Sequence, residues 1–287
     1  MQISESAKAA ARSRRLFRSL TSLAALTATA VFAMWSTGPV GADAAASRPA
    51  VAHAGIVPPK NPSRSLPPSP DFLGAGICRS ASNGRACNRE VLKAIAHARK
   101  VLEKMGGMSF SLHAYLKLTS AERLFVTADL ERTERGLPPA TVLSESLDKV
   151  AQVGARRDED PPLSRVPARL PGGGQVVGLG GNWAGGWLNA LGADYGWMYD
   201  DGLNSPNEGC TKQDHSGCWG HRDNVLGTFS SKAACGGGAS ALAMGAGYAA
   251  GKDSQTELFA GVCGHAPTDV VLTWARAKSL LGIKRHK

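Results

Sequence analysis

Residues 119–139 have the sequence Thr-Ser-Ala-Glu-Arg-Leu-Phe-Val-Thr-Ala-Asp-Leu-Glu-Arg-Thr-Glu-Arg-Gly-Leu-Pro-Pro, and this stretch encodes both ends of a helix. Thr119, followed three residues later by Glu122, has the pattern of a capping box, which opens helices. The helix is predicted to continue through Leu124 and to stop at Gly136, because two prolines follow directly. The stretch therefore predicts a helix whose limits are set locally.

Two more helices are predicted on either side of this one. The first starts near Asn88 and ends at Gly106-Gly107. Its apolar residues recur at steps of four and three, so they share one face: Val91, Ile95, Ala98, Leu102 and Met105. The second covers about 144–157, with Leu147, Val150 and Ala151 directed inward.

The second half of the chain changes character and favours strands. Short apolar runs between glycine-rich turns predict four of them: Gln175–Leu179, Val225–Phe229, Ala241–Ala249 and Glu257–Val262. The small residues of 239–250 suggest a strand packed closely under another layer, and 194–200 suggests a short helix. Helices first and strands later indicate an α+β fold.

The N-terminus has the features of a secretory signal peptide over residues 1–44. Arg14 and Arg15 belong to a basic segment, Leu20 to Trp35 carry no charge, and Ala42-Asp43-Ala44 fits a cleavage site. General secretion and twin-arginine export both remain open, and an uncleaved anchor is the lesser alternative.

Four further segments follow the signal peptide. Residues 45–70 contain seven prolines and are predicted to be a disordered linker. Residues 71–118 are interpreted as a helical extension, 119–265 as the main domain, and 266–287 as a basic tail.

Charge and cysteine content point to an exported protein. The net charge is +10, which either attracts the chain to anionic wall polymers or phospholipids, or simply keeps it soluble. The sequence contains no stripe of basic and aromatic residues that would indicate nucleic-acid binding.

An even count of six cysteines indicates disulfides, and sequence order suggests three local pairs among fifteen possible pairings: Cys78–Cys87, Cys210–Cys218 and Cys235–Cys263. We expect a secreted or cell-surface monomer that meets the membrane only through its signal peptide.

Several motifs, taken in order, resemble the CAP superfamily, the SCP-like domains of cysteine-rich secretory proteins, in its bacterial branch. They are the 119–139 helix, Gly180-Gly181-Asn182-Trp183-Ala184, Trp197-Met198, Gly220-His221-Arg222-Asp223-Asn224-Val225-Leu226, and the closing segments Gly245–Tyr248 and Thr256–Phe259. The resemblance covers about residues 119–263. It implies a three-layer α-β-α sandwich with a groove on one side.

Many CAP domains gather two histidines and two acids in that groove, and some bind a divalent metal there. His221 matches one histidine, whereas the other falls on Gly154 and one acid falls on Gly181. Asp200 or Asp201 matches the second acid. Glycine offers no side-chain ligand, so we expect no metal or other cofactor, unless His215 reaches in from the loop.

Two alternatives concern the residues around His221. The imidazole either contacts a substrate or ligand, or only braces its own turn. The spacing of Cys210, His215, Cys218 and His221 also fits a zinc site, although export favours a Cys210–Cys218 disulfide.

The groove implied by the resemblance would be lined by polar and aromatic residues: Asn182, Trp183, Trp187, Tyr195, His215 and Asn224. Aromatic faces stack on sugars or line apolar pockets. Trp197 and Trp219 are interpreted as core anchors instead.

Two functions follow from these expectations. The first is a non-catalytic extracytoplasmic binding module for a wall glycan, a lipid or a surface protein. The second is a cell-wall hydrolase in which His221 and Asp200 or Asp201 form an acid/base pair.

Overall fold

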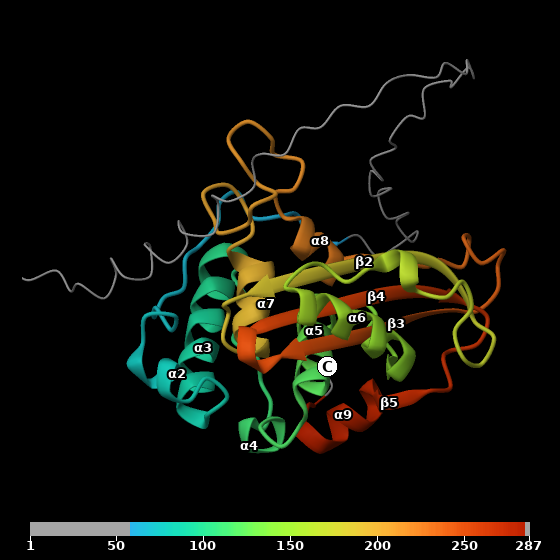
Figure 1. The fold of residues 1–287 in the computed structure, drawn as a ribbon, viewed down its shortest axis with the longest axis horizontal. Coiled ribbons are helices and arrows are strands. Elements are labelled where there is room, and N and C mark those ends of the chain that lie inside the picture. Colours follow the sequence, from blue (N-terminus) through green and yellow to red (C-terminus); the bar gives the residue numbers. More distant parts are fainter. Residues whose placement is uncertain (1–57, 285–287) are drawn as a thin grey trace, which may run out of the picture. The chain divides into compact units, whose positions relative to one another are not determined.

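The structure is a computed structural model and describes residues 58–284 (Figure 1). The predicted signal peptide and residues 45–57 of the predicted linker lie outside this range. Within it, helices combine with a mixed five-stranded sheet. The prediction of an α+β fold is therefore confirmed.

The sheet has the strand order β2-β4-β3-β1-β5. Its three long strands, β2 (Gln175–Gly185), β4 (Ser254–Cys263) and β3 (Ser240–Ala249), are antiparallel neighbours. The short β1 (Val142–Ser144) runs parallel to β3, and β5 (Val270–Thr273) is antiparallel to β1 at the edge.

Helices cover both faces of this sheet. Successive residues of a strand point to opposite sides, so a single strand contributes to the apolar core on each face. On β3, Leu242 and Met244 join the larger apolar core, together with α3 (Arg85–Ala98), α5 (Ser120–Thr133), α7 (Ala190–Tyr199), α8 (Gly220–Leu226) and α9 (Trp274–Leu281). Ala243 faces the other way and packs with Leu147 and Val150 of α6 (Glu145–Arg157). The small helices α2 (Gly76–Ser80) and α4 (Leu112–Tyr115), and one-turn segments at Arg99–Glu103, Leu163–Arg165 and Ala250–Lys252, complete the fold.

Close packing of α6 on β3 explains the small residues of that strand. A Cβ added to Gly245 would lie 2.3 Å from the carbonyl carbon of Leu147, and one added to Gly247 would lie 2.6 Å from the backbone nitrogen of Gln152. The helix backbone thus rests directly on the strand, as the small residues of 239–250 predicted.

The capping box at Thr119 is present and opens α5. The Thr119 hydroxyl accepts from the Glu122 N–H at 3.3 Å, and the Glu122 carboxylate accepts from the Thr119 N–H at 2.7 Å. The helix ends at Thr133, and the chain then turns through Gly136, which has a φ of +74°. Ten consecutive residues of α5, Arg123–Arg132, are buried, so this helix crosses the centre of the fold.

The described part of the predicted linker, residues 58–70, is ordered against the domain, so the prediction of disorder is wrong there. The Leu66 N–H donates to the Tyr199 carbonyl at 2.8 Å, and the Tyr195 hydroxyl donates to the Leu66 carbonyl at 2.9 Å. Asn61 also donates to the Asp223 carboxylate at 2.9 Å. Proline removes only a backbone donor, so the carbonyls of this segment remain free to accept hydrogen bonds.

Two other expectations are corrected. Val225–Phe229 is not a strand, because Val225 and Leu226 complete α8 and point into the core. A run this short cannot distinguish a buried helix from a strand by periodicity alone. The described part of the predicted basic tail 266–287, residues 266–284, belongs to the domain, since 270–273 form β5 and α9 buries Trp274 and Leu281 in the main core.

Three disulfides join the six cysteines in the predicted pairs: Cys78–Cys87, Cys210–Cys218 and Cys235–Cys263. With Cys210 and Cys218 bonded to each other, the zinc interpretation of this loop loses its thiolates. Three disulfides indicate an oxidising, extracellular environment. Between residues 58 and 284, no helix has the length and apolar character needed to cross a membrane.

Candidate functional site

His221 stands in the first turn of α8 and is held by Asp201. One carboxylate oxygen of Asp201 lies 2.6 Å from Nδ1 of the imidazole. The other accepts the backbone N–H of His221 at 3.0 Å and faces that of Arg222 at 3.4 Å. Asp201 therefore satisfies the open N–H groups of α8 and orients the imidazole at the same time.

The pair combines a buried acid with a partly open imidazole. The Asp201 side chain is 1% exposed and that of His221 is 26% exposed. Burial opposes the charged form of His221, but the hydrogen bond and charge of Asp201, joined by the charge of Asp160, raise its pKa above the ordinary value. With Nδ1 engaged by Asp201, Nε2 is the nitrogen left to meet another molecule.

Asp200, the other acid that the sequence offered, does not join the pair. One of its carboxylate oxygens is buried without a hydrogen-bond partner in the described structure. Burial, with the neighbouring charge of Asp201, raises the pKa of Asp200 to about 6. No contact links Asp200 to His221 in residues 58–284, so the geometry selects Asp201.

Two of the predicted groove residues brace β2 against α8. Asn182 is fully buried, and its amide donates to Glu257 at 2.7 Å and to the His221 carbonyl at 3.0 Å. The Asn224 amide donates to the Gly181 carbonyl and to the Asn182 side chain, both at 2.9 Å. Both N–H donors of the Asn182 amide are used inside the fold. The expectation that Asn182 lines an open groove is therefore wrong.

The aromatic residues predicted to line one groove have different environments in the structure. Tyr195 is buried beneath Phe72 and Trp187, with ring centroids 5.6 and 6.2 Å away, and so cannot line a groove. Trp183 is half-buried and donates its indole N–H to Ser254 at 2.9 Å, while its backbone N–H bonds to Asp160.

The remaining predicted residues are placed as follows. Trp197 and Trp219 are buried, as predicted. His215 is exposed in the loop closed by Cys210–Cys218 and makes no described contact with His221. It therefore does not complete a ligand set.

The two glycine positions of the implied metal set are filled by neighbouring chain. A Cβ at Gly154 would lie 2.8 Å from the Glu159 carbonyl oxygen and 2.9 Å from that of Asp160. A Cβ at Gly181 would lie 2.5 Å from the Pro161 ring. The segment 159–161 thus occupies the space that ligand side chains would need. Within residues 58–284, no group of three or more metal-binding side chains gathers.

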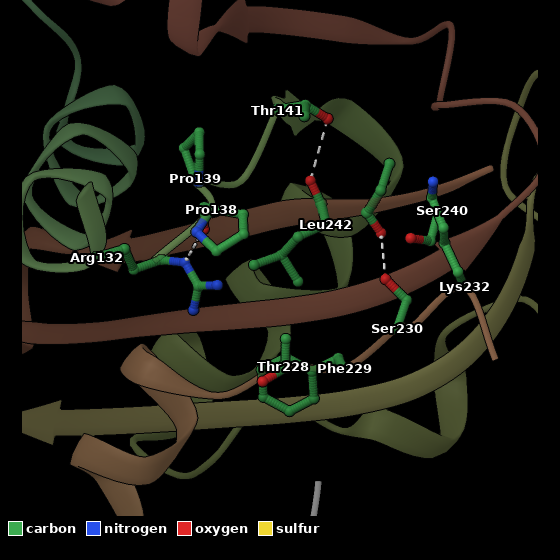
Figure 2. Close-up of a pocket in the computed structure, with 11 residues that line it drawn as sticks. Arg132, Pro138, Pro139, Thr141, Thr228, Phe229, Ser230, Lys232, Ser240 and Leu242 are labelled. Carbon is green, nitrogen blue, oxygen red and sulfur yellow. Dashed lines mark hydrogen bonds between the residues drawn. The ribbon is translucent and has the colours of Figure 1, made fainter. Parts of the chain in front are cut away.

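A second feature, which the sequence did not suggest, is a cavity of about 340 Å³ at the C-terminal end of α5 (Figure 2). Arg132 and the Pro138-Pro139 pair border it on one side, and residues 228–230, Lys232 and the start of β3 border it on the other. Arg132 is only 1% exposed. A charged residue of a helix usually faces solvent, so nothing in the sequence marked Arg132 as buried.

A network of buried charges beside α5 was also unforeseen. Glu131 accepts the Tyr199 hydroxyl at 2.5 Å and pairs with Arg135, which pairs with Glu103. Arg222 bonds to Glu103 as well. Because these charges satisfy one another between helices, they form a structural brace.

The comparisons with protein-family models, curated proteins and solved structures give no match. The site is therefore interpreted from its own geometry.

Proposed function

We propose that the chain is an exported binding module with a CAP-like three-layer sandwich, which recognises an extracytoplasmic ligand at the face around His221 without catalysis. The single observation behind this proposal is the segment 159–161, which fills the space at Gly154 and Gly181. An imidazole oriented by Asp201 remains at this face, but a metal-activated water would lack half of its ligands.

The proposed location rests on two features. The three disulfides suit an oxidising compartment, and the signal-like segment 1–44 would deliver the chain there. We propose secretion or surface attachment, with a wall glycan as the first ligand class. Half-buried Trp183 and the polar groups of His221 and Asp160 offer the stacking and hydrogen bonds that sugars require.

A wall hydrolase is the second candidate, and the 2.6 Å contact between His221 and Asp201 favours it. A buried carboxylate that holds the Nδ1 proton of a histidine supports general-base chemistry at Nε2. In that mechanism Asp201 positions the ring, His221 transfers the proton, and Asp200 has no part.

The experiment is a co-sedimentation of the mature chain, residues 45–287, with purified bacterial cell walls, combined with an assay for soluble fragments. His221→Ala is compared with His215→Ala, a matched change at an exposed histidine outside the site. We expect His221→Ala to weaken sedimentation at least about fivefold, consistent with the loss of one or two polar contacts, while His215→Ala binds normally.

The outcomes separate the candidates. Sedimentation without fragment release supports the binding module. Fragment release that disappears in His221→Ala would instead establish the hydrolase. If neither occurs, but anionic phospholipid vesicles retain the chain in a His221-dependent way, the ligand class is lipid; if His221→Ala changes nothing in any assay, the proposal is wrong.

A further inference from the structure

The cavity beside Arg132 lies apart from His221, at the opposite end of α8. The Arg132 guanidinium contacts the carbonyls of Val225, in the last turn of that helix, and of its C-cap Gly227, whereas His221 lies in the first turn. At about 340 Å³, the cavity falls at the lower end of the usual range of small-molecule pockets, roughly 300–1,000 Å³. It is therefore large enough for a compact ligand.

Arg132 has hydrogen-bond donors to spare. Its Nε donates to the Pro138 carbonyl at 2.8 Å, and Nη1 donates to the Val225 and Gly227 carbonyls at 2.7 and 2.8 Å. A guanidinium carries five N–H groups, so these three bonds leave both N–H groups of Nη2 available as donors. Within residues 58–284, Nη2 has no hydrogen-bond partner and no carboxylate lies within ion-pair distance of this side chain.

The charge of Arg132 is also poorly balanced. Burial lowers the pKa of Arg132 to about 10, which leaves it charged at neutral pH. Burial likewise raises the pKa of Glu257 to about 8 and raises that of Asp129, so both neighbouring acids hold their protons more tightly than they would in water. A buried cation whose contacts are all neutral carbonyls is costly, and an anion that enters the cavity would lower that cost.

The other walls define the body of the ligand. Apolar surface comes from Pro138, Pro139, Phe229 and Leu242, and a second cation, Lys232, stands at the side opposite Arg132 (Figure 2). Lys232 is exposed and has no ion pair in the described structure. One anionic group and a small apolar body would match this lining.

We propose that the cavity binds a small monocarboxylate with a compact apolar body, whose carboxylate accepts hydrogen bonds from Nη2 of Arg132. The apolar part packs against the Pro138-Pro139 pair and Phe229. Lys232 draws the anion to the entrance. This site goes beyond the proposed recognition at His221 and is independent of it.

The test is a titration of the mature chain with phenylacetate, followed by calorimetry and by ¹⁵N–¹H shifts of residues around the cavity. Phenylacetamide is the matched neutral ligand. We expect phenylacetate to bind at least about tenfold more tightly, because a charged hydrogen-bond partner at a buried guanidinium is worth about one to two powers of ten.

The variants avoid Arg132, since it also holds the end of α8 and its replacement would disturb the fold. Ser240→Trp fills the cavity, because Ser240 lies on the same face of β3 as Leu242. Lys232→Glu reverses the charge at the entrance, and Lys252→Glu makes the same change at an exposed lysine outside the cavity.

We expect Ser240→Trp to abolish binding, Lys232→Glu to weaken it severalfold, and Lys252→Glu to leave it unchanged. Equal binding of the acid and the amide would overturn the assignment of Arg132 as the anion's partner. Undiminished binding to a folded Ser240→Trp protein, or no binding of phenylacetate at millimolar concentration, would overturn the site itself.

Discussion

The contact of α6 with β3 can be tested by a single methyl group. In Gly245→Ala, the new Cβ would lie 2.3 Å from the carbonyl carbon and 2.5 Å from the carbonyl oxygen of Leu147. These are backbone atoms, which cannot rotate away, so α6 must move off the sheet. Overpacking of this kind costs typically about 1–3 kcal/mol, and we expect the upper end or more because the obstacle is backbone.

The matched control is Gly106→Ala, where a new Cβ meets nothing within 4 Å and φ is not positive. This change should be neutral, or stabilising by up to about 1 kcal/mol, because alanine reduces the entropy of the unfolded chain. A loss of about 3 kcal/mol in Gly245→Ala lowers Tm by roughly 6–12 °C for a domain of this size. Thermal unfolding followed by circular dichroism measures both variants. If their Tm values agree within about 2 °C, the close packing of α6 on β3 is refuted.

Three more predictions follow from the described contacts. Asp201→Asn should lower the pKa of His221, which an NMR titration of its ring proton measures. In the parent protein the folded pKa of His221 is raised. The stabilisation from the charged pair is therefore complete below the unfolded pKa of about 6.5 and is lost as pH rises through the folded pKa. An unchanged midpoint would contradict the contact. Tyr199→Phe removes the hydroxyl that donates to buried Glu131 and should cost about 2 kcal/mol in urea unfolding, whereas Tyr248→Phe, with no described hydroxyl partner, should cost little. Removal of Cys235–Cys263, whose cysteines are 28 residues apart in sequence, should cost about 3.6 kcal/mol, against about 2.6 kcal/mol for Cys78–Cys87, whose cysteines are nine residues apart. Equal losses would mean that loop length does not decide the effect.

The features that sequence predicted well are those determined locally. The capping box needs only Thr119 and Glu122, and the three disulfides join cysteines that are close in sequence. Glycine positions in β3 predicted close packing because only a missing side chain allows it. In each case a few neighbouring residues carry the physical cause.

The features that sequence missed depend on distant contacts. Residues 58–70 are ordered because Tyr195 and Tyr199 of α7 bond to Leu66, and proline content says nothing about such partners. The edge strand β5 pairs with a β1 of only three residues, too short for a periodic signal. The cavity at Arg132 exists because segments far apart in the chain enclose it.

The site was predicted only in part, for the same reason. The resemblance pointed to His221 and offered Asp200 and Asp201 equally, since adjacent residues cannot be ranked without geometry. The structure places Asp201 on the imidazole and leaves Asp200 apart from it. The filling of the space at Gly154 and Gly181 by segment 159–161 could not be seen from those glycines alone.

The double role of Asp201 makes it possible to separate recognition from folding at this face. Its carboxylate accepts the His221 backbone N–H as well as binding the ring, so it caps α8 whichever side chain stands at position 221. His221→Ala keeps that cap and removes only the imidazole, whereas Asp201→Asn disturbs both. If ligand binding falls in His221→Ala while Tm is retained, the imidazole contacts the ligand. If His221→Ala changes neither quantity, whereas Asp201→Asn lowers both Tm and binding, the role of the Asp201–His221 pair is to cap the N-terminus of α8.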